Sequence, residues 1–141
     1  MAFSTYLADA ILQWLRTQAF PTALSNVYIS LHSAAPGNNG TSADVTASIT
    51  GSASRTQLAS SNLGAPTAGS TGLGRQVANT NTATITSNAV NPTTIQCTHF
   101  GLWDAATGGN FLYSGVLDTA TNVSLGNVVQ FSAGSLVIRN T

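Results

Sequence analysis

Apolar residues near the start of the chain recur with the period of a helix. Ser4 is a typical N-cap residue, and it precedes an apolar stripe at spacings of three and four that consists of Leu7, Ala8, Ile11, Leu12 and Leu15. Pro21 ends the pattern, because proline cannot continue a helix. The spacing predicts one helix over about residues 4–18. We expect its stripe to pack on the rest of the chain, with Trp14 at the edge of that contact.

After Pro21 the apolar period changes from that of a helix to that of a strand. Val27, Ile29 and Leu31 alternate with Tyr28, Ser30 and His32, which is typical of a strand with one buried face. The residues 35–40 that follow are rich in Pro, Gly and Asn and therefore favour a turn.

Small polar residues dominate the next part of the chain, from Thr41 to Gly74. We expect a long loop excursion over about 34–74, either disordered in isolation or ordered by a neighbouring subunit, because long loops in compact domains are usually functional. Its sizeable and charged side chains make it a candidate segment for contacts between molecules. These candidate contact residues are Asp44, Val45, Ile49, Arg55, Leu58 and Leu63.

From Arg75 onward, strand patterns separated by turn residues follow one another. We expect strands over Gln76–Ser87, Thr93–Trp103, Asn110–Leu117, Val128–Phe131 and Ser135–Arg139. The turn 104–109 begins with Asp and ends with two glycines, which is a strong hairpin signal. A single early helix followed by short strands excludes the alternation of a parallel sheet.

Together these patterns predict a mainly β fold in one domain over residues 1–141. The expected architecture is an antiparallel β-sandwich, jelly-roll-like, with one N-terminal α-helix and a long extended loop. We expect the helix to pack Leu7, Ile11, Leu12 and Leu15 on a sheet face that includes Ile95, Trp103, Val129, Phe131 and Ile138.

Charge is scarce and balanced. Four Arg and four Asp are the only charged side chains, or 6% of the chain, whereas about 25% is typical. Such a chain cannot build the basic face that nucleic acids require, so no direct nucleic-acid partner is expected. Ser, Thr and Asn make up about a third of the residues. A neutral surface of this kind favours a protein that packs against other chains, where unpaired charges would be costly to bury.

The sequence also indicates the cellular compartment in which the protein is made. The apolar runs are far shorter than the roughly 20 residues of a membrane span, and Met1–Ser4 lacks the basic start of a signal peptide. We expect a protein made in the cytoplasm, without a membrane partner. Its one cysteine, Cys97, excludes an intrachain disulfide.

Residues that carry chemistry are few. Cys97 and His99 stand two apart in one predicted strand, on the face of Ile95 and Trp103, where a buried thiol and a hydrogen-bonded histidine are expected rather than a metal pair. The four aspartates have turn or helix roles, and the glycine-rich stretch 69–74 lacks the Gly-Lys-Ser/Thr ending of a phosphate-binding loop. We expect no catalytic, cofactor-binding or metal site, and no enzyme.

Three blocks of sequence together resemble a known family. They are Tyr6–Leu15 with Val27–Gly37, then Thr98–Leu112, and finally Gly126–Ile138. This layout resembles small virion proteins of tailed bacteriophages, labelled tail-fibre-like proteins or capsid decoration (cement) proteins. The family pattern places an acidic residue and then Tyr-x-Arg after the Pro-Gly turn. Asp44 and Arg55 match it, but Ala53 replaces the tyrosine.

The resemblance implies a structural role in the virion without catalysis. The first hypothesis is a cement protein on the capsid surface, a homotrimer that binds and stabilises the major capsid protein. The alternative is a tail or tail-fibre component that contacts the host surface. The excursion 41–74 contains no aromatic residue, which favours adhesion to another viral protein.

Overall fold

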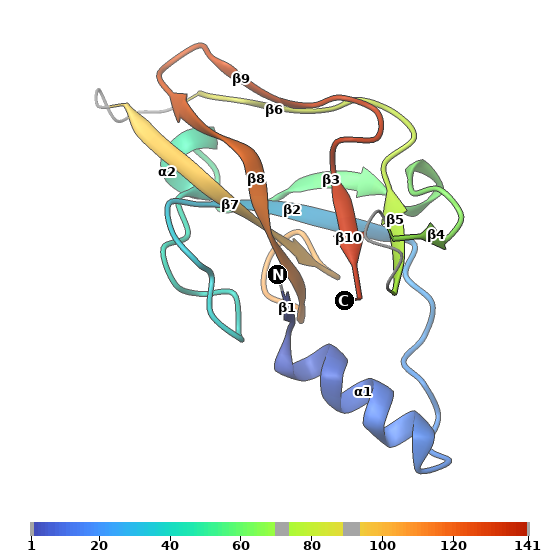
Figure 1. Ribbon diagram of the computed structural model, residues 1–141. Coiled ribbons are helices and arrows are strands. Elements are labelled where there is room, and N and C mark those ends of the chain that lie inside the picture. The colour runs from blue at the N-terminus through green and yellow to red at the C-terminus, as the bar shows by residue number, and fades with distance from the viewer. Residues whose placement is uncertain (1, 70–73, 89–93, 141) are drawn as a thin grey trace.

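The computed structural model describes residues 2–69, 74–88 and 94–140 (Figure 1). In chain order its elements are β1 (Ala2–Phe3), α1 (Thr5–Leu15), β2 (Asn26–His32), α2 (Thr46–Thr50), β3 (Thr56–Ala59), the 3-10 helix η1 (Ser60–Asn62), β4 (Thr67–Ala68), β5 (Arg75–Ala78), β6 (Ala83–Thr86), β7 (Ile95–Trp103), β8 (Phe111–Val123), β9 (Val128–Phe131) and β10 (Val137–Arg139). Thr93 of a predicted strand and residues 70–73 of the predicted excursion and glycine-rich stretch lie outside the described residues.

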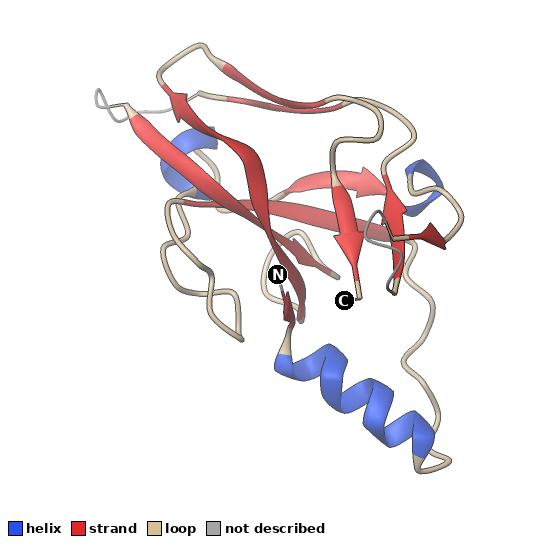
Figure 2. Ribbon diagram, viewed as in Figure 1, coloured by secondary structure: helices blue, strands red, loops and turns tan. Residues whose placement is uncertain are grey.

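All strand pairs in this part of the chain are antiparallel. They form a five-stranded sheet in the order β1-β8-β7-β2-β3, a three-stranded sheet β10-β5-β4 and a two-stranded sheet β6-β9 (Figure 2). The predicted mainly β fold, with antiparallel sheets and one helix near the N-terminus, is therefore confirmed.

The alternation in β2 places one face of the large sheet in the core. Val27, Ile29 and Leu31 are buried, and Ile29 and Leu31 pair with Leu102 and Phe100 of β7. Side chains from β6, β9 and α2 complete the same apolar cluster. The core thus joins the five-stranded sheet to the β6-β9 pair.

The prediction that Cys97 lies on the same face of β7 as Trp103 is wrong. A register irregularity between Cys97 and His99 shifts the alternation by one residue, so that Cys97, Phe100 and Leu102 all belong to the core. Trp103 is buried on the opposite face of the sheet, where it contacts Phe111. An irregularity of this kind re-aims the side chains that follow it.

The predicted packing of the N-terminal helix on the sheet is wrong for Leu12 and Leu15, whereas Leu7 and Ile11 are half-buried. Helix α1 has no buried residue, and Leu12 and Leu15 are 59% and 67% exposed. It begins at the end of β1 and projects away from the sheets, and the segment 16–25 returns along it to β2 (Figure 1). Substitution of Leu15 by Asp should therefore not unfold the body, contrary to what the sequence pattern suggests.

The predicted excursion is largely ordered by its own chain. Within residues 41–69 it forms α2, β3, η1 and β4, and β3 extends the large sheet by pairing with β2. Ile49 and Leu58 are buried in the core at 0% and 3% exposure. A few well-spaced apolar residues in a small polar segment suffice to anchor it.

The single strand expected over Gln76–Ser87 is in fact two, β5 and β6. Asn79 separates them, and its buried side chain binds several backbone segments. Its amide donates to the carbonyls of Asn81, Phe131 and Ser132, and its carbonyl oxygen accepts from the N–H of Leu136 at 2.9 Å. Asn79 thereby fixes the corner where the chain passes from one sheet to another.

Candidate interaction surface

The most prominent surface feature is the projecting element, here called the arm, which comprises α1 and the return segment 16–24. Its base is fixed to the body by backbone bonds. The N–H of Ser4 donates to the Leu112 carbonyl at 3.0 Å, and the N–H of Thr5 donates to the Asn38 carbonyl at 3.3 Å. The Ser4 hydroxyl caps α1 by accepting from the N–H of Leu7, as the sequence predicts.

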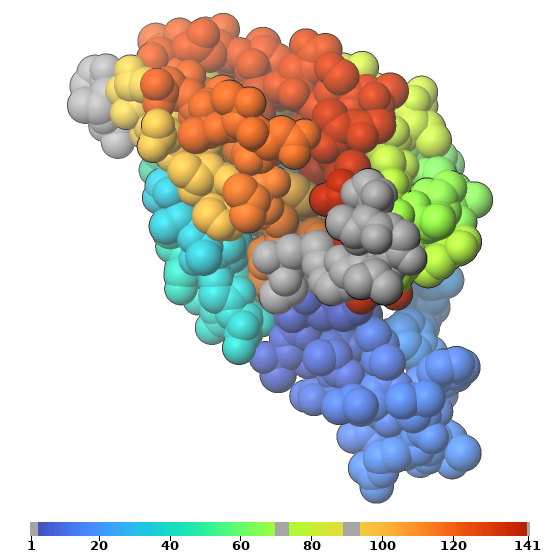
Figure 3. Space-filling model, in the orientation of Figure 1, coloured from blue at the N-terminus to red at the C-terminus, as the bar shows by residue number. Residues whose placement is uncertain are grey.

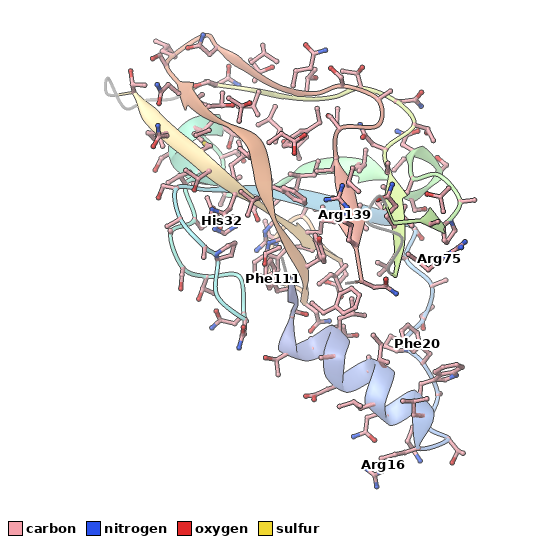
Figure 4. All side chains as sticks on the ribbon, in the orientation of Figure 1. Arg16, Phe20, His32, Arg75, Phe111 and Arg139 are labelled. Atoms are coloured by element: carbon pink, nitrogen blue, oxygen red, sulfur yellow. The ribbon has the colours of Figure 1, made fainter. Side chains whose placement is uncertain are left out.

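Large apolar side chains are concentrated on this arm. Of the nine that are strongly exposed among the described residues, six belong to it. They are Tyr6, Leu12, Trp14, Leu15, Phe20 and Leu24, with exposed fractions between 38% and 67%. Figure 3 shows the arm standing out from the body, and Figure 4 places Arg16 at its tip and Phe20 on its return side. A concentration of exposed large apolar side chains on one element is typical of an interaction site.

A groove runs along the base of the arm. It has a volume of about 570 Å³ and lies between α1, the return segment and the β7–β8 turn, with lining residues that include Tyr6, Leu7, Phe20, Leu24, Asp104 and Leu112. Asp104 is already engaged, since its carboxylate accepts from the backbone N–H and side-chain amide of Asn110. The free lining of the groove is therefore mainly apolar.

The candidate contact residues of the excursion differ in burial. Ile49 and Leu58 are core residues of their own chain, which corrects their assignment to a contact surface. Val45 and Leu63 are partly buried against the same core. Asp44 is exposed and accepts from the N–H of Thr46 at 2.9 Å. Contact of the exposed positions with another molecule stays a prediction.

Arg55, the remaining candidate, holds the β7–β8 turn. Its guanidinium Nη1 donates to the carbonyls of Ala105 and Gly108, both at 2.9 Å. The guanidinium carbon Cζ lies 3.6 Å from the centre of the Trp103 ring. The backbone N–H of Arg55 donates to Ala106. Arg55 thus joins the excursion to the turn that forms one wall of the groove.

Replacement of Arg55 by Met should lower the free energy of unfolding by about 1–3 kcal/mol. The substitution keeps most of the aliphatic stem but removes two charge-assisted hydrogen bonds and the cation–π contact. Urea unfolding measures the change. Gln57→Met, at an exposed position of β3, is the matched control and should have almost no effect. Equal losses in the two variants would contradict this role.

A buried polar chain on the same sheet face was not found from the sequence. The Trp103 indole N–H donates to Ser30 Oγ at 3.0 Å, the Ser30 hydroxyl lies 2.8 Å from His32 Nε2, and His32 Nδ1 lies 2.9 Å from the Ser42 carbonyl oxygen. Since a carbonyl can only accept, Nδ1 carries the proton and Nε2 accepts from Ser30. The alternation along β2 predicts that the side chains of Ser30 and His32 face solvent. This prediction is wrong because residues 36–42 cover the second face of the sheet, and local alternation does not show that cover.

Ser30 and His32 have the spacing of a nucleophile and its base, but the pair is enclosed. Both residues are 0% exposed, so a substrate cannot reach the hydroxyl. The second ring nitrogen binds a backbone carbonyl instead of an orienting carboxylate. The geometry therefore assigns them to positioning the loop over the sheet.

Burial lowers the pKa of His32 below its ordinary value of 6.5, although the bond to Ser42 and the charge of Asp44 oppose the shift. The fold therefore prefers the neutral imidazole. Its contribution to stability is fully present above pH 6.5 and is lost as the pH falls through the lower pKa of the folded state.

Urea unfolding of the wild type should thus show a falling stability between about pH 7 and pH 5. A His32→Asn variant should be less stable at neutral pH but should depend less on pH over this range. His99→Asn is the comparison at the more accessible histidine, whose pKa burial also lowers. If His32→Asn keeps the wild-type pH dependence, His32 is not responsible for it.

No group of three or more His, Cys, Asp or Glu residues that could hold a metal ion occurs in the described part of the chain. Cys97 is buried, as expected, and burial raises the pKa of its thiol to about 11, so that it stays protonated at neutral pH. Among the same residues, no helix is long and apolar enough to cross a membrane.

The protein has a β-rich body and an exposed apolar arm. The arm is suited to contacts with other macromolecules, which is typical of a structural protein in an assembly. The model of the family described as "Podophage GP4 fiber I protein gp80" matches residues 2–139, and the chain belongs to this family. It is a bacteriophage virion structural protein, which confirms the resemblance seen in its sequence. A comparison with curated proteins found no match.

Proposed function

We propose that this chain is a non-enzymatic structural component of the tail-fibre apparatus of a tailed bacteriophage. The family match over residues 2–139 carries the proposal, because the description of that family names a fibre protein of a podophage. This favours the tail-fibre hypothesis over the capsid cement hypothesis. The proposed partners are other virion proteins, without a nucleic acid, membrane or cofactor.

The arm supports this proposal physically. A fibre component has to be fixed to neighbouring chains, and an exposed apolar helix on a short base is a suitable means of attachment. Its charges are a single Asp9 and a single Arg16. Attachment through apolar packing should therefore weaken little when salt is raised, since screening acts on charges.

The test compares complete particles with particles that lack this chain. Loss of the chain should reduce adsorption to host cells and leave the temperature of DNA release from the head unchanged. Add-back of the purified wild-type chain should restore adsorption, and add-back of a Leu12→Ser/Leu15→Ser variant should not. Unchanged adsorption together with a lower temperature of DNA release would overturn the proposal and favour a capsid cement protein.

A further inference from the structure

The base of the arm is bonded to a loop that also binds the buried histidine. The N–H of Thr5, in the first turn of α1, donates to the carbonyl of Asn38 at 3.3 Å. Asn38 belongs to the loop 36–42, and the carbonyl of Ser42 at the end of this loop accepts from His32 Nδ1 at 2.9 Å. The loop therefore connects His32 to the arm.

The loop is a compact cover over the second face of the large sheet. Gly40 packs against Trp103, since an added Cβ would lie 2.7 Å from the ring atom Cζ2. The N–H of Ser42 donates to the Pro36 carbonyl at 3.0 Å, which closes the loop on itself. His32 lies beside the loop (Figure 4) and is 0% exposed. Water can reach the imidazole ring only if the loop moves.

Every polar group of the buried chain beside the loop has a partner only while His32 is neutral. The donors are the indole N–H of Trp103, the hydroxyl of Ser30 and Nδ1–H of His32. The acceptors are Ser30 Oγ, His32 Nε2 and the Ser42 carbonyl, so that donors and acceptors are equal in number. A proton on Nε2 replaces an acceptor by a donor. The Ser30 hydroxyl then lacks its acceptor and a charge lies away from water, and both are costly inside a protein.

The charged groups that face His32 do not remove this cost. Burial is the largest effect and lowers the pKa of His32, and the charges of His99, which pairs with His32 from β7, and of Arg55 lower it further. The bond to the Ser42 carbonyl and the carboxylate of Asp44, whose backbone forms a bridge with His32, raise that pKa. Movement of the loop relieves the cost of protonation, because it admits water to the imidazolium ring.

We propose that the loop 36–42 is an acid-sensitive switch for the arm: protonation of His32 opens the loop, and the bond from Thr5 to Asn38 is lost with it. The core lies on the opposite face of the large sheet and stays folded. The inference concerns the isolated chain and does not depend on its place in the virion. It extends the effect of His32 from the stability of the body to the attachment of the arm.

Hydrogen exchange of the full-length chain between about pH 7 and pH 5, with rates corrected for the intrinsic effect of pH, tests the proposal. A helix of 11 residues is only marginally stable by itself, so loss of a bond at its first turn should increase its opening. The amides of α1 and of the loop should lose protection about tenfold or more at the lower pH, whereas those of the central strand β7 should keep it. Equal loss in α1 and β7 would indicate unfolding of the whole body and would overturn the proposal.

Two histidine variants identify the group that titrates. His32→Asn keeps an N–H donor near the position of Nδ1 but cannot be protonated, so the protection of α1 and of the loop should no longer change with pH. His99→Asn is the control and should respond to acid as the wild type does. Circular dichroism shows that each variant is folded. An acid response that persists in His32→Asn, or is lost in His99→Asn, would contradict the role of His32.

Thr5→Pro tests the connection between the loop and the arm. Proline lacks the N–H that donates to Asn38, and it is suited to the first position of a helix. Ser4 has φ of −64° and ψ of 162°, the extended conformation that a residue before proline favours. In this variant α1 should be less protected at neutral pH and should not respond to acid, whereas the loop should still respond. An unchanged acid response of α1 in Thr5→Pro, or a wild-type α1 whose protection is independent of pH, would overturn the proposal.

Discussion

Replacement of Ile49 by alanine is expected to lower the free energy of unfolding by about 2–5 kcal/mol, the usual range for loss of a fully buried aliphatic side chain. Ile49 is 0% exposed in helix α2 and belongs to the core cluster. The loss is large against a typical total stability of about 5–15 kcal/mol. Denaturant unfolding followed by tryptophan fluorescence measures it.

The matched control is Leu125→Ala, which truncates a side chain that is 69% exposed. This variant should differ from the wild type by less than about 0.5 kcal/mol. A similarly small effect of Ile49→Ala would mean that residues 41–69 do not contribute to the core. The segment would then be the independent excursion that its composition suggests.

A second large effect is expected for Gly40→Ala. Gly40 adopts a left-handed backbone with φ of +73°, and an added Cβ would lie 2.7 Å from Trp103 Cζ2 and would also overlap the Phe111 ring. The backbone conformation costs about 1–2 kcal/mol for a residue other than glycine, and overpacking adds about 1–3 kcal/mol. We expect a loss of about 3–4 kcal/mol in thermal or urea unfolding.

Gly126→Ala separates these two contributions. Gly126 has a φ of +83°, but nothing lies within 4 Å of an added Cβ. This variant should therefore show only the backbone cost of about 1–2 kcal/mol. If the two alanine variants lose equal stability, residues 36–42 are not packed on Trp103 and Phe111 as described.

Much of the fold could be predicted from the sequence because local patterns determine it. The helix cap at Ser4, the alternation in β2 and the turn at 104–109 each depend on nearby residues, and each occurs in the structure. The division of one predicted strand at Asn79 could not be predicted, because the bonds of its side chain to Phe131, Ser132 and Leu136 join distant parts of the chain.

The interaction surface was only partly predictable for a related reason. An apolar stripe on a helix shows that one face requires apolar contact, but it does not show whether that contact lies in the same chain. Leu12 and Leu15 were therefore assigned to the core, although they are exposed on the arm. The signal that sequence analysis missed is the continuation of large apolar residues through Trp14, Phe20 and Leu24, beyond the stripe and around the helix end.

The location of this chain on purified virions tests the central claim most directly. Antibody against the chain, labelled with gold and imaged by electron microscopy, should mark the tail end of each particle at a few sites. Particles that lack the chain are the control for specific labelling. A label spread over the surface of the head would contradict the tail-fibre assignment and would indicate a capsid decoration protein.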